Sequence, residues 1–116
     1  MSELKFRAWQ RHHKEMFEVG AIQFRKPRFV VKLDSLVTWE LDEVELMQYT
    51  GLKDKGGREI YEGDIVKADW HWDKPHQVIW PNDYYGLIEY GLDAESNLEV
   101  IGNIYENPEL LLESEK

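Results

Sequence analysis

The chain contains no cysteine, and this absence removes several classes of protein at once. Without thiols there is no disulfide framework, no thiolate zinc site and no cysteine nucleophile. No stretch approaches the ~20 apolar residues that a membrane-spanning helix needs. The N-terminus also lacks the apolar run of a signal peptide. We therefore expect a soluble, cytoplasmic protein with no membrane partner.

The common signatures of catalysis are missing as well. Gly56 and Gly57 are not followed by the Lys-Ser/Thr pair that a phosphate-binding loop needs, and no serine has the context of a nucleophile elbow. Paired carboxylates can hold Mg²⁺ or act as acid and base, but turn chemistry accounts for Asp54 and Asp64 without catalysis. We predict that the protein is not an enzyme. The carboxylates considered are Asp54, Glu59, Glu62 and Asp64.

Histidine is too sparse and too poorly spaced to predict a metal site. A tetrahedral zinc site needs three or four oriented ligands. His12 and His13 are adjacent, so on a strand they would face opposite ways. His71 and Asp73 share one parity, and His76 lies farther along. We interpret the histidines as exposed turn residues and predict no metal and no cofactor.

Positive charge is scarce and unevenly distributed. The net charge is −9. Residues 1–32 hold eight Lys/Arg and three Asp/Glu, a balance of +5, whereas residues 33–116 hold six Lys/Arg and twenty Asp/Glu, a balance of −14. A chain this acidic is a poor candidate for wrapping duplex DNA, because Lys and Arg supply most of the affinity of proteins for DNA. The basic third contains a candidate strip interleaved with Trp9 and Phe24: Lys5, Arg7, Arg11, Arg25, Lys26 and Arg28.

Three readings of this charge pattern stay open. The basic strip is a nucleic-acid surface, or it pairs with the acidic remainder within one chain or across a subunit interface. In the third reading, the acidic part imitates DNA phosphates and the protein is an inhibitor of DNA-binding proteins.

Aromatic residues are plentiful between Trp70 and Tyr90. Such rings stack on unpaired bases at ~1–3 kcal/mol per base, anchor protein interfaces, or fill a small core. The acidic neighbours Asp69, Asp73 and Asp83 favour a protein partner over a phosphate backbone. The candidate aromatic binding surface consists of Trp70, Trp72, Trp80, Tyr84 and Tyr85.

Short alternating segments bounded by turn formers predict a β-rich fold, a sandwich or a barrel. Lys53–Gly57 should be an exposed hairpin tip, and Gly20 and Gly102 should mark bulges. Asp42–Glu45 is compatible with one helical turn. Asn107 and Pro108 suit the cap and the first position of a short helix. The predicted strands are Leu4–Trp9, Met16–Val19, Ala21–Phe24, Phe29–Leu33, Leu36–Leu41, Glu45–Thr50, Ile65–Trp70, Gln77–Trp80, Tyr84–Tyr90 and Leu98–Ile104.

Three blocks of sequence resemble the YopX family, small proteins of phages and prophages. They are Lys5–Trp9, Met47–Lys67 (MQYTGLKDKGGREIYEGDIVK) and Glu99–Leu111, about a third of the chain, in the family's order. The resemblance implies a β-rich, SH3-like barrel and a phage origin. It implies no assigned activity and carries no catalytic residues to this chain.

We therefore expect a mainly β fold: a small SH3-like barrel with additional N-terminal strands and a short C-terminal helical turn. The chain should form a single domain over residues 1–116, with an N-terminal subregion 1–45 packed on a barrel 46–112 as the finer division. We expect a non-enzymatic accessory protein of the host cytoplasm that binds a protein, with nucleic-acid binding or DNA mimicry as alternatives. Exposed strand edges favour a homo-oligomer.

Overall fold

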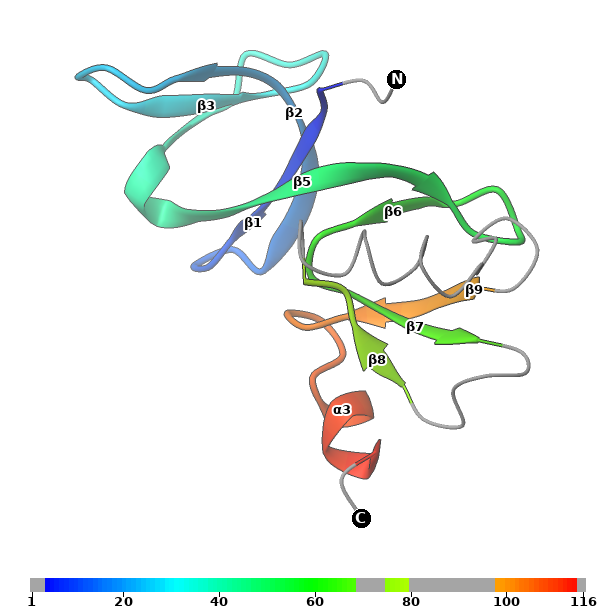
Figure 1. Cartoon of the computed structure of the whole chain (residues 1–116). Helices are drawn as coiled ribbons and strands as arrows, with labels where there is room; N and C mark the ends of the chain where they lie inside the picture. The colour runs from blue at the N-terminus through cyan, green and yellow to red at the C-terminus, as the bar shows by residue number, and fades with distance from the viewer. Residues whose placement is uncertain (1–3, 69–74, 80–97, 115–116) are drawn as a thin grey trace. The chain divides into compact units, whose positions relative to one another are not determined.

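Figure 1 shows the computed structural model of the chain, which describes residues 4–68, 75–79 and 98–114. Antiparallel strands dominate these residues, so the mainly β prediction is confirmed. The elements are β1 (Phe6–Gln10), β2 (Glu15–Gln23), β3 (Phe29–Lys32), β4 (Thr38–Glu40), the 3-10 turn η1 (Leu41–Glu43), β5 (Val44–Lys53), β6 (Glu59–Tyr61), β7 (Asp64–Ala68), β8 (His76–Gln77), β9 (Leu98–Asn103) and α3 (Glu109–Ser114).

The chain divides into two compact units, one of residues 4–48 and one that begins at Tyr49. The boundary falls inside β5. The first half of β5 pairs with β1, from Gln10↔Val44 to Phe6↔Gln48, and its second half pairs with β6. One strand therefore belongs to both units.

The N-terminal unit is an antiparallel sheet in the order β4-β3-β2-β1-β5. Its strands enclose one apolar cluster, in which Ala8 and Val30 are fully buried beside Phe17 and Val44. β1 contributes to burial on both faces, since Ala8 and the adjacent Trp9 are both buried. The sequence interleaves Trp9 with the basic strip, and its burial takes the ring out of that surface.

Gly20 forms the predicted bulge in β2. The register with β3 shifts between Val19 and Ala21, which leaves Gly20 as the extra residue. A Cβ at this position would lie 3.1 Å from the Cα of Leu33, so the residue lets β2 and the end of β3 approach closely.

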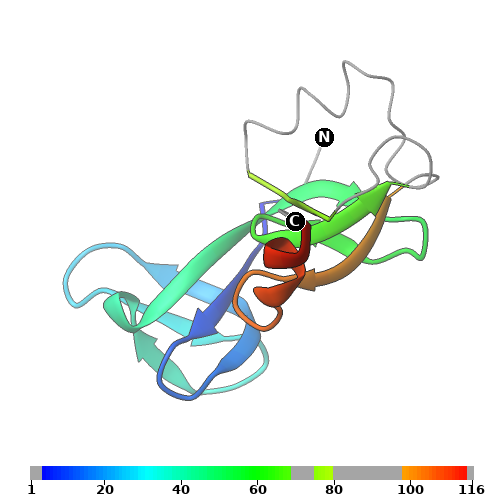
Figure 2. The ribbon, with the colours of Figure 1, turned by 90° about the horizontal axis from the view of Figure 1, so that it is seen from below.

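The C-terminal unit packs β8-β7-β9 and the β5–β6 hairpin around a second cluster of Ile60, Val66, Val78 and Leu98. The β7–β9 register also shifts, between Ile65↔Gly102 and Val66↔Val100, as predicted near Gly102. Figure 2 shows α3 following β9 through a short loop. Among the described residues the sheets do not close into a barrel.

Three local predictions need correction. Asp54 is not part of an exposed tip, because its side chain is only 3% exposed and its carboxylate accepts hydrogen bonds from the backbone. Asn107 does not cap α3 with its side chain; its Oδ1 accepts a hydrogen bond from the Asn103 backbone N–H at 3.2 Å instead. The strand predicted over Gln77–Trp80 is reduced to β8, while the part of it at Trp80 lies outside the described residues.

No helix in the parts of the chain that the structure describes is long and apolar enough to cross a membrane.

Candidate binding surface

The predicted basic strip is divided between the two ends of β2. Arg11 lies in the turn between β1 and β2, whereas Arg25, Lys26 and Arg28 lie in the turn between β2 and β3. Because both hairpins are antiparallel, these two turns stand at opposite ends of the strand. Lys5, which directly precedes β1, and Arg7 on β1 are half-buried. The structure therefore brings together only the second group, which we call the basic turn (residues 25–28).

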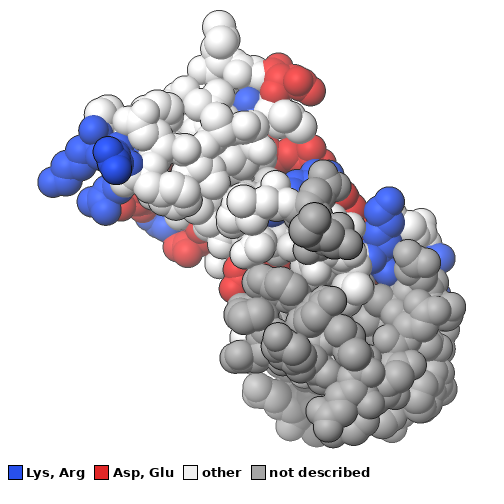
Figure 3. All heavy atoms as spheres, turned by 45° about the horizontal axis from the view of Figure 1, so that its top comes forward, with Lys and Arg blue, Asp and Glu red and all other residues white. Residues whose placement is uncertain are grey.

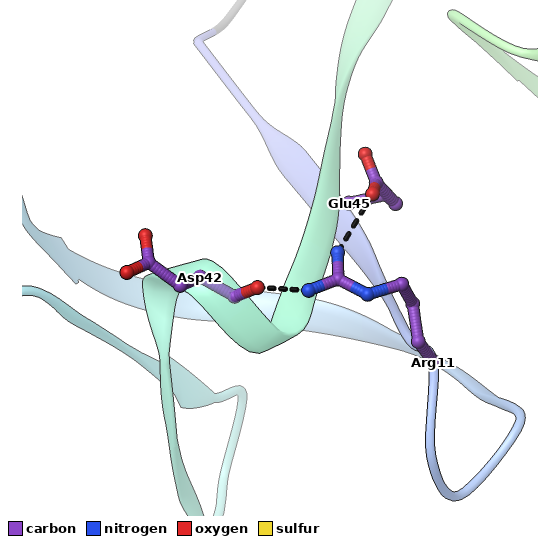
Figure 4. A network of polar contacts seen from close by, with 3 residues as sticks. All are labelled: Arg11, Asp42 and Glu45. Atoms are coloured by element: carbon purple, nitrogen blue, oxygen red, sulfur yellow. Dashed lines mark hydrogen bonds and ion pairs between the residues drawn. The ribbon is translucent and has the colours of Figure 1, made fainter.

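Arg11 contacts two residues of the acidic part of its own chain, Asp42 and Glu45. Its Nη1 donates to Glu45 Oε1 at 2.7 Å, and its Nη2 donates to the main-chain oxygen of Asp42 in η1 (Figure 4). Lys32 makes a similar contact, since its Nζ lies 2.8 Å from Glu15 Oε2. For these two cations the structure supports the reading that basic residues pair with carboxylates within one chain.

The side-chain amide of Gln23 and the backbone N–H of Leu41, which donates to the Arg28 carbonyl oxygen at 3.1 Å, both hold the basic turn. Gln23 Nε2 donates to the carbonyl oxygens of Arg25 at 3.0 Å and Pro27 at 2.7 Å, and the Lys26–Pro27 peptide is cis. All side chains of residues 25–28 are exposed. Figure 3 shows Lys and Arg side chains gathered at this end of the N-terminal unit. The turn thus offers three cations on a braced backbone.

An apolar groove of about 290 Å³ lies beside this turn, across the N-terminal ends of β1 and the bulged half of β2. Two of its residues are far more exposed than large apolar side chains usually are: Leu4 at 79% and Phe24 at 63%. Among the described residues that line the groove, Lys5 alone is charged. The apolar groove is lined by Leu4, Lys5, Phe6, Val19, Gly20, Ala21, Ile22 and Phe24.

The sequence and the bulge together explain why this groove exists. Phe6 faces the groove from β1, and Ala21, Ile22 and Phe24 follow the Gly20 bulge on β2. A bulge twists and bends its strand, and Ala21 is a small, exposed side chain at the centre of the segment. Phe24 ends the groove and is followed directly by Arg25, so the groove and the basic turn are continuous.

A second groove, of about 340 Å³, lies between the basic turn and β4. It combines the cations of Lys26 and Arg28 with the carboxylates of Glu40 and Asp42. Its charges are mixed, and it has no single preference of sign for a ligand. The remaining lining residues are Pro27, Phe29 and Thr38.

The central carboxylates have structural hydrogen bonds. Asp54 Oδ1 accepts from the backbone N–H groups of Gly56 and Arg58, and Oδ2 accepts from that of Val100, all at 2.9 Å. Burial raises the pKa of Asp54, but the bonds from Val100, Arg58 and Gly56 and the Arg58 charge outweigh it, so the pKa lies below its ordinary value. The Asp54 carboxylate is therefore ionised, and both of its oxygens already accept hydrogen bonds from the backbone.

Asp64, His12 and His13 are described by the structure, whereas the candidates His71 and Asp73 lie outside the described residues. Asp64 Oδ2 accepts from the Tyr61 N–H at 2.8 Å, which is the turn role predicted from the sequence. The ring of His13 lies 4.7 Å from that of Trp39, and His12 is exposed in the same β1–β2 turn. In the described ranges no three His, Asp or Glu side chains are placed to hold one metal ion.

The predicted aromatic surface lies outside the described residues. Its five rings fall within residues 69–74 and 80–97. It therefore stays a prediction from sequence: Trp70, Trp72, Trp80, Tyr84 and Tyr85.

Sequence reasoning missed the apolar groove, although it placed its parts. In the predicted strand Leu4–Trp9, the alternation places Leu4 and Phe6 on one face, and Phe24 is interleaved with the basic residues. The signal that could have joined them is the glycine bulge, which brings two strand ends into one surface. Its strongest local mark is an exposed aromatic next to three cations, Phe24-Arg25-Lys26-Pro27-Arg28.

Comparison with known proteins identifies one family and a solved relative. The model of the YopX protein family matches residues 5–112. No curated protein matches the chain. A similar solved structure is the crystal structure of protein EF1440 from Enterococcus faecalis, with a TM-score of 0.58 and 29% sequence identity. That match covers 96% of this chain and 99% of the other. The likeness extends along nearly the whole chain and carries no activity with it.

Proposed function

The chain belongs to the YopX family, and we propose that it acts as a non-enzymatic binding module of a phage or prophage in the cytoplasm of the bacterial host. Its partner is a protein, which it holds through the apolar groove and the adjoining basic turn. The partner segment presents apolar side chains to the groove and carboxylates to the turn.

The observation that carries this proposal is the exposure of the groove. Leu4 and Phe24 together leave large apolar surface in water, beside an apolar floor that includes Ala21. Contiguous exposed apolar surface on a small protein marks an interaction site, and aromatic residues act as anchors in such sites. The cations at the end of the groove attract an acidic segment and fix its direction.

Site-specific photo-crosslinking tests the proposal. Phe24 is replaced by p-benzoylphenylalanine, and crosslinked proteins are identified by mass spectrometry from cells that produce the full chain. Leu36 is the matched control, because it is 96% exposed and apolar but does not line the groove. We expect a discrete crosslinked protein from position 24 and none from position 36. The proposal is wrong if position 24 gives no crosslink, or gives the same products as position 36.

Nucleic-acid binding is the second candidate, and the basic turn favours it. Arg25, Lys26 and Arg28 stand next to the exposed ring of Phe24, an arrangement that suits a phosphate backbone and a stacked base. It predicts that labelled single-stranded DNA or RNA binds with steep salt dependence. Reversing the charge of Arg28 should weaken that binding strongly, whereas the same change at the exposed Lys67 should not. Equal affinities of the two variants would end this candidate.

We also keep the SH3-like description as a proposal and attach it to the N-terminal unit. Five short antiparallel strands, with η1 between the fourth and the fifth, curl around one apolar cluster there. This supports residues 4–48, rather than the residues from Leu46 onward, as the SH3-like part. An experimental structure in which β4 and β5 stand at the two ends of a flat sheet would contradict it.

A further inference from the structure

We infer that the apolar groove of one copy of this chain holds the C-terminal segment, residues 106–116, of a second copy. This inference rests on the proposed function, because it names the occupant of the same groove. Its consequence is a homo-oligomer in which each copy contributes an acceptor surface and a docking segment.

The C-terminal segment has the chemistry that the groove and the basic turn require. It contains four glutamates and one lysine, together with three consecutive leucines, Leu110–Leu112. Leu112 is 64% exposed on α3. Glu109 is exposed in the first turn of the helix, and no basic residue stands in its last turn. The segment therefore presents an apolar side chain flanked by negative charge.

The helix itself gains from such a contact. α3 is six residues long, and a helix this short is marginal in water without tertiary packing. Its first residues are tied to the preceding loop by hydrogen bonds from Leu110 N to Asn107 O and from Leu111 N to Pro108 O, both at 3.1 Å. The exposed face at Leu112 is the part that packing against a second copy would cover.

The uneven distribution of charge along the chain favours a second copy of the same chain as the partner. Residues 1–32 carry +5 and residues 33–116 carry −14. Two identical copies would repel each other through their net charge of −9 unless the basic part of one faces the acidic part of the other. Docking of the C-terminal segment at the basic turn gives that arrangement. When each copy docks into the other, two equal contacts form and the assembly closes as a two-fold dimer.

Sedimentation equilibrium of the full chain and two surface variants tests this inference. Phe24→Glu places a carboxylate in the groove, and Leu112→Glu removes the apolar docking residue. Each should weaken self-association by at least about tenfold, the effect of losing an interface anchor. The matched control Leu36→Glu changes an even more exposed apolar residue outside the groove and should alter the association constant less than about twofold. Circular dichroism checks folding, and Ala21→Glu replaces Phe24→Glu if that variant unfolds.

Mixing the two variants gives the sharpest result. The Leu112→Glu copy keeps an intact groove and the Phe24→Glu copy keeps an intact C-terminal segment, so the mixture should form a heterodimer that neither variant forms alone. Any of three results overturns the inference: the wild-type chain is monomeric, only one of the two variants weakens self-association, or the mixture stays monomeric. If the chain is monomeric but position 24 still crosslinks to another protein, the proposed function stands and only the inference about the second copy is wrong. Loss of both self-association and crosslinking overturns both.

Discussion

The carboxylate of Asp54 connects two segments that lie far apart in the sequence. It receives hydrogen bonds from Gly56 and Arg58 in its own turn and from Val100 on β9. We expect Asp54→Asn to lower the free energy of unfolding at pH 7 by about 1.5–3 kcal/mol, because a buried charged acceptor is lost. Urea denaturation of both proteins measures this difference.

The same residue predicts a pH dependence. The folded pKa of Asp54 is lowered, whereas the unfolded value is about 3.9. Its contribution is therefore fully present above the unfolded value and is lost as the pH falls through the folded pKa. The gap between wild type and Asp54→Asn should narrow below about pH 4. Glu45→Gln is the matched control: its pair with Arg11 is 43% exposed on both sides, so we expect only about 0.2–1 kcal/mol. Equal effects of the two changes would contradict the structural role of Asp54.

At the scale of the element, the connection from β9 to α3 depends on one close approach. A Cβ at Gly102 would lie 2.6 Å from Asn107 Oδ1 and 2.9 Å from Asn107 Cβ. Gly102→Ala should displace Asn107 from its hydrogen bond with Asn103 and lower the free energy of unfolding by about 1–3 kcal/mol. Differential scanning calorimetry measures the change.

Gly56→Ala is the matched control for that prediction. Among the described residues, a Cβ at Gly56 meets only Asp54 Oδ1, at an ordinary 3.5 Å. We expect stability that is unchanged or raised by up to about 1 kcal/mol, since alanine restricts the unfolded chain. If Gly102→Ala is tolerated as well as Gly56→Ala, the packing of the loop against Gly102 does not position α3.

At the scale of the whole molecule, the division of charge predicts that salt weakens self-association. Raising the ionic strength from about 0.1 M to about 1 M shortens the screening length from ~10 Å to ~3 Å. The attraction between basic turn and C-terminal segment should fall accordingly, while the apolar contact at Phe24 remains. The association constant of an Arg28→Gln variant should depend less on salt than that of the wild type. Association that strengthens with salt would show that repulsion between the acidic copies dominates instead.

Local features were the ones that the sequence predicted best. The bulge at Gly20, the single turn at residues 41–43 and the turn before Asp64 follow from residues adjacent in the chain. The burial of Asp54 did not, because its third donor, Val100, is 46 positions away. The division of the basic strip could not be predicted for a similar reason: the reversal of the chain at each hairpin places Arg11 and Arg28 at opposite ends of β2.

The candidate site illustrates the same limit. Alternation places Phe6 and Ala21 on their strands, but the groove needs the pairing of β1 with β2 and the bend at Gly20 before these residues form one surface. The exposure of Phe24 also depends on where β2 ends, one residue before it, at Gln23. Composition alone treats that ring as a core candidate, and its exposure is what supports a binding role.

The strand β5, which pairs with β1 in one unit and with β6 in the other, bears on how such genes can be shuffled. A recombination joint at the boundary between Gln48 and Tyr49 would fall in the middle of a ten-residue strand. The incoming half of β5 would keep its own pairing with β6, but its side chains would have to continue the alternation of the first half, because a shift of one residue turns every side chain to the other face. Exchange should be rejected inside β5, so the N-terminal unit is expected to be inherited together with the whole of this strand.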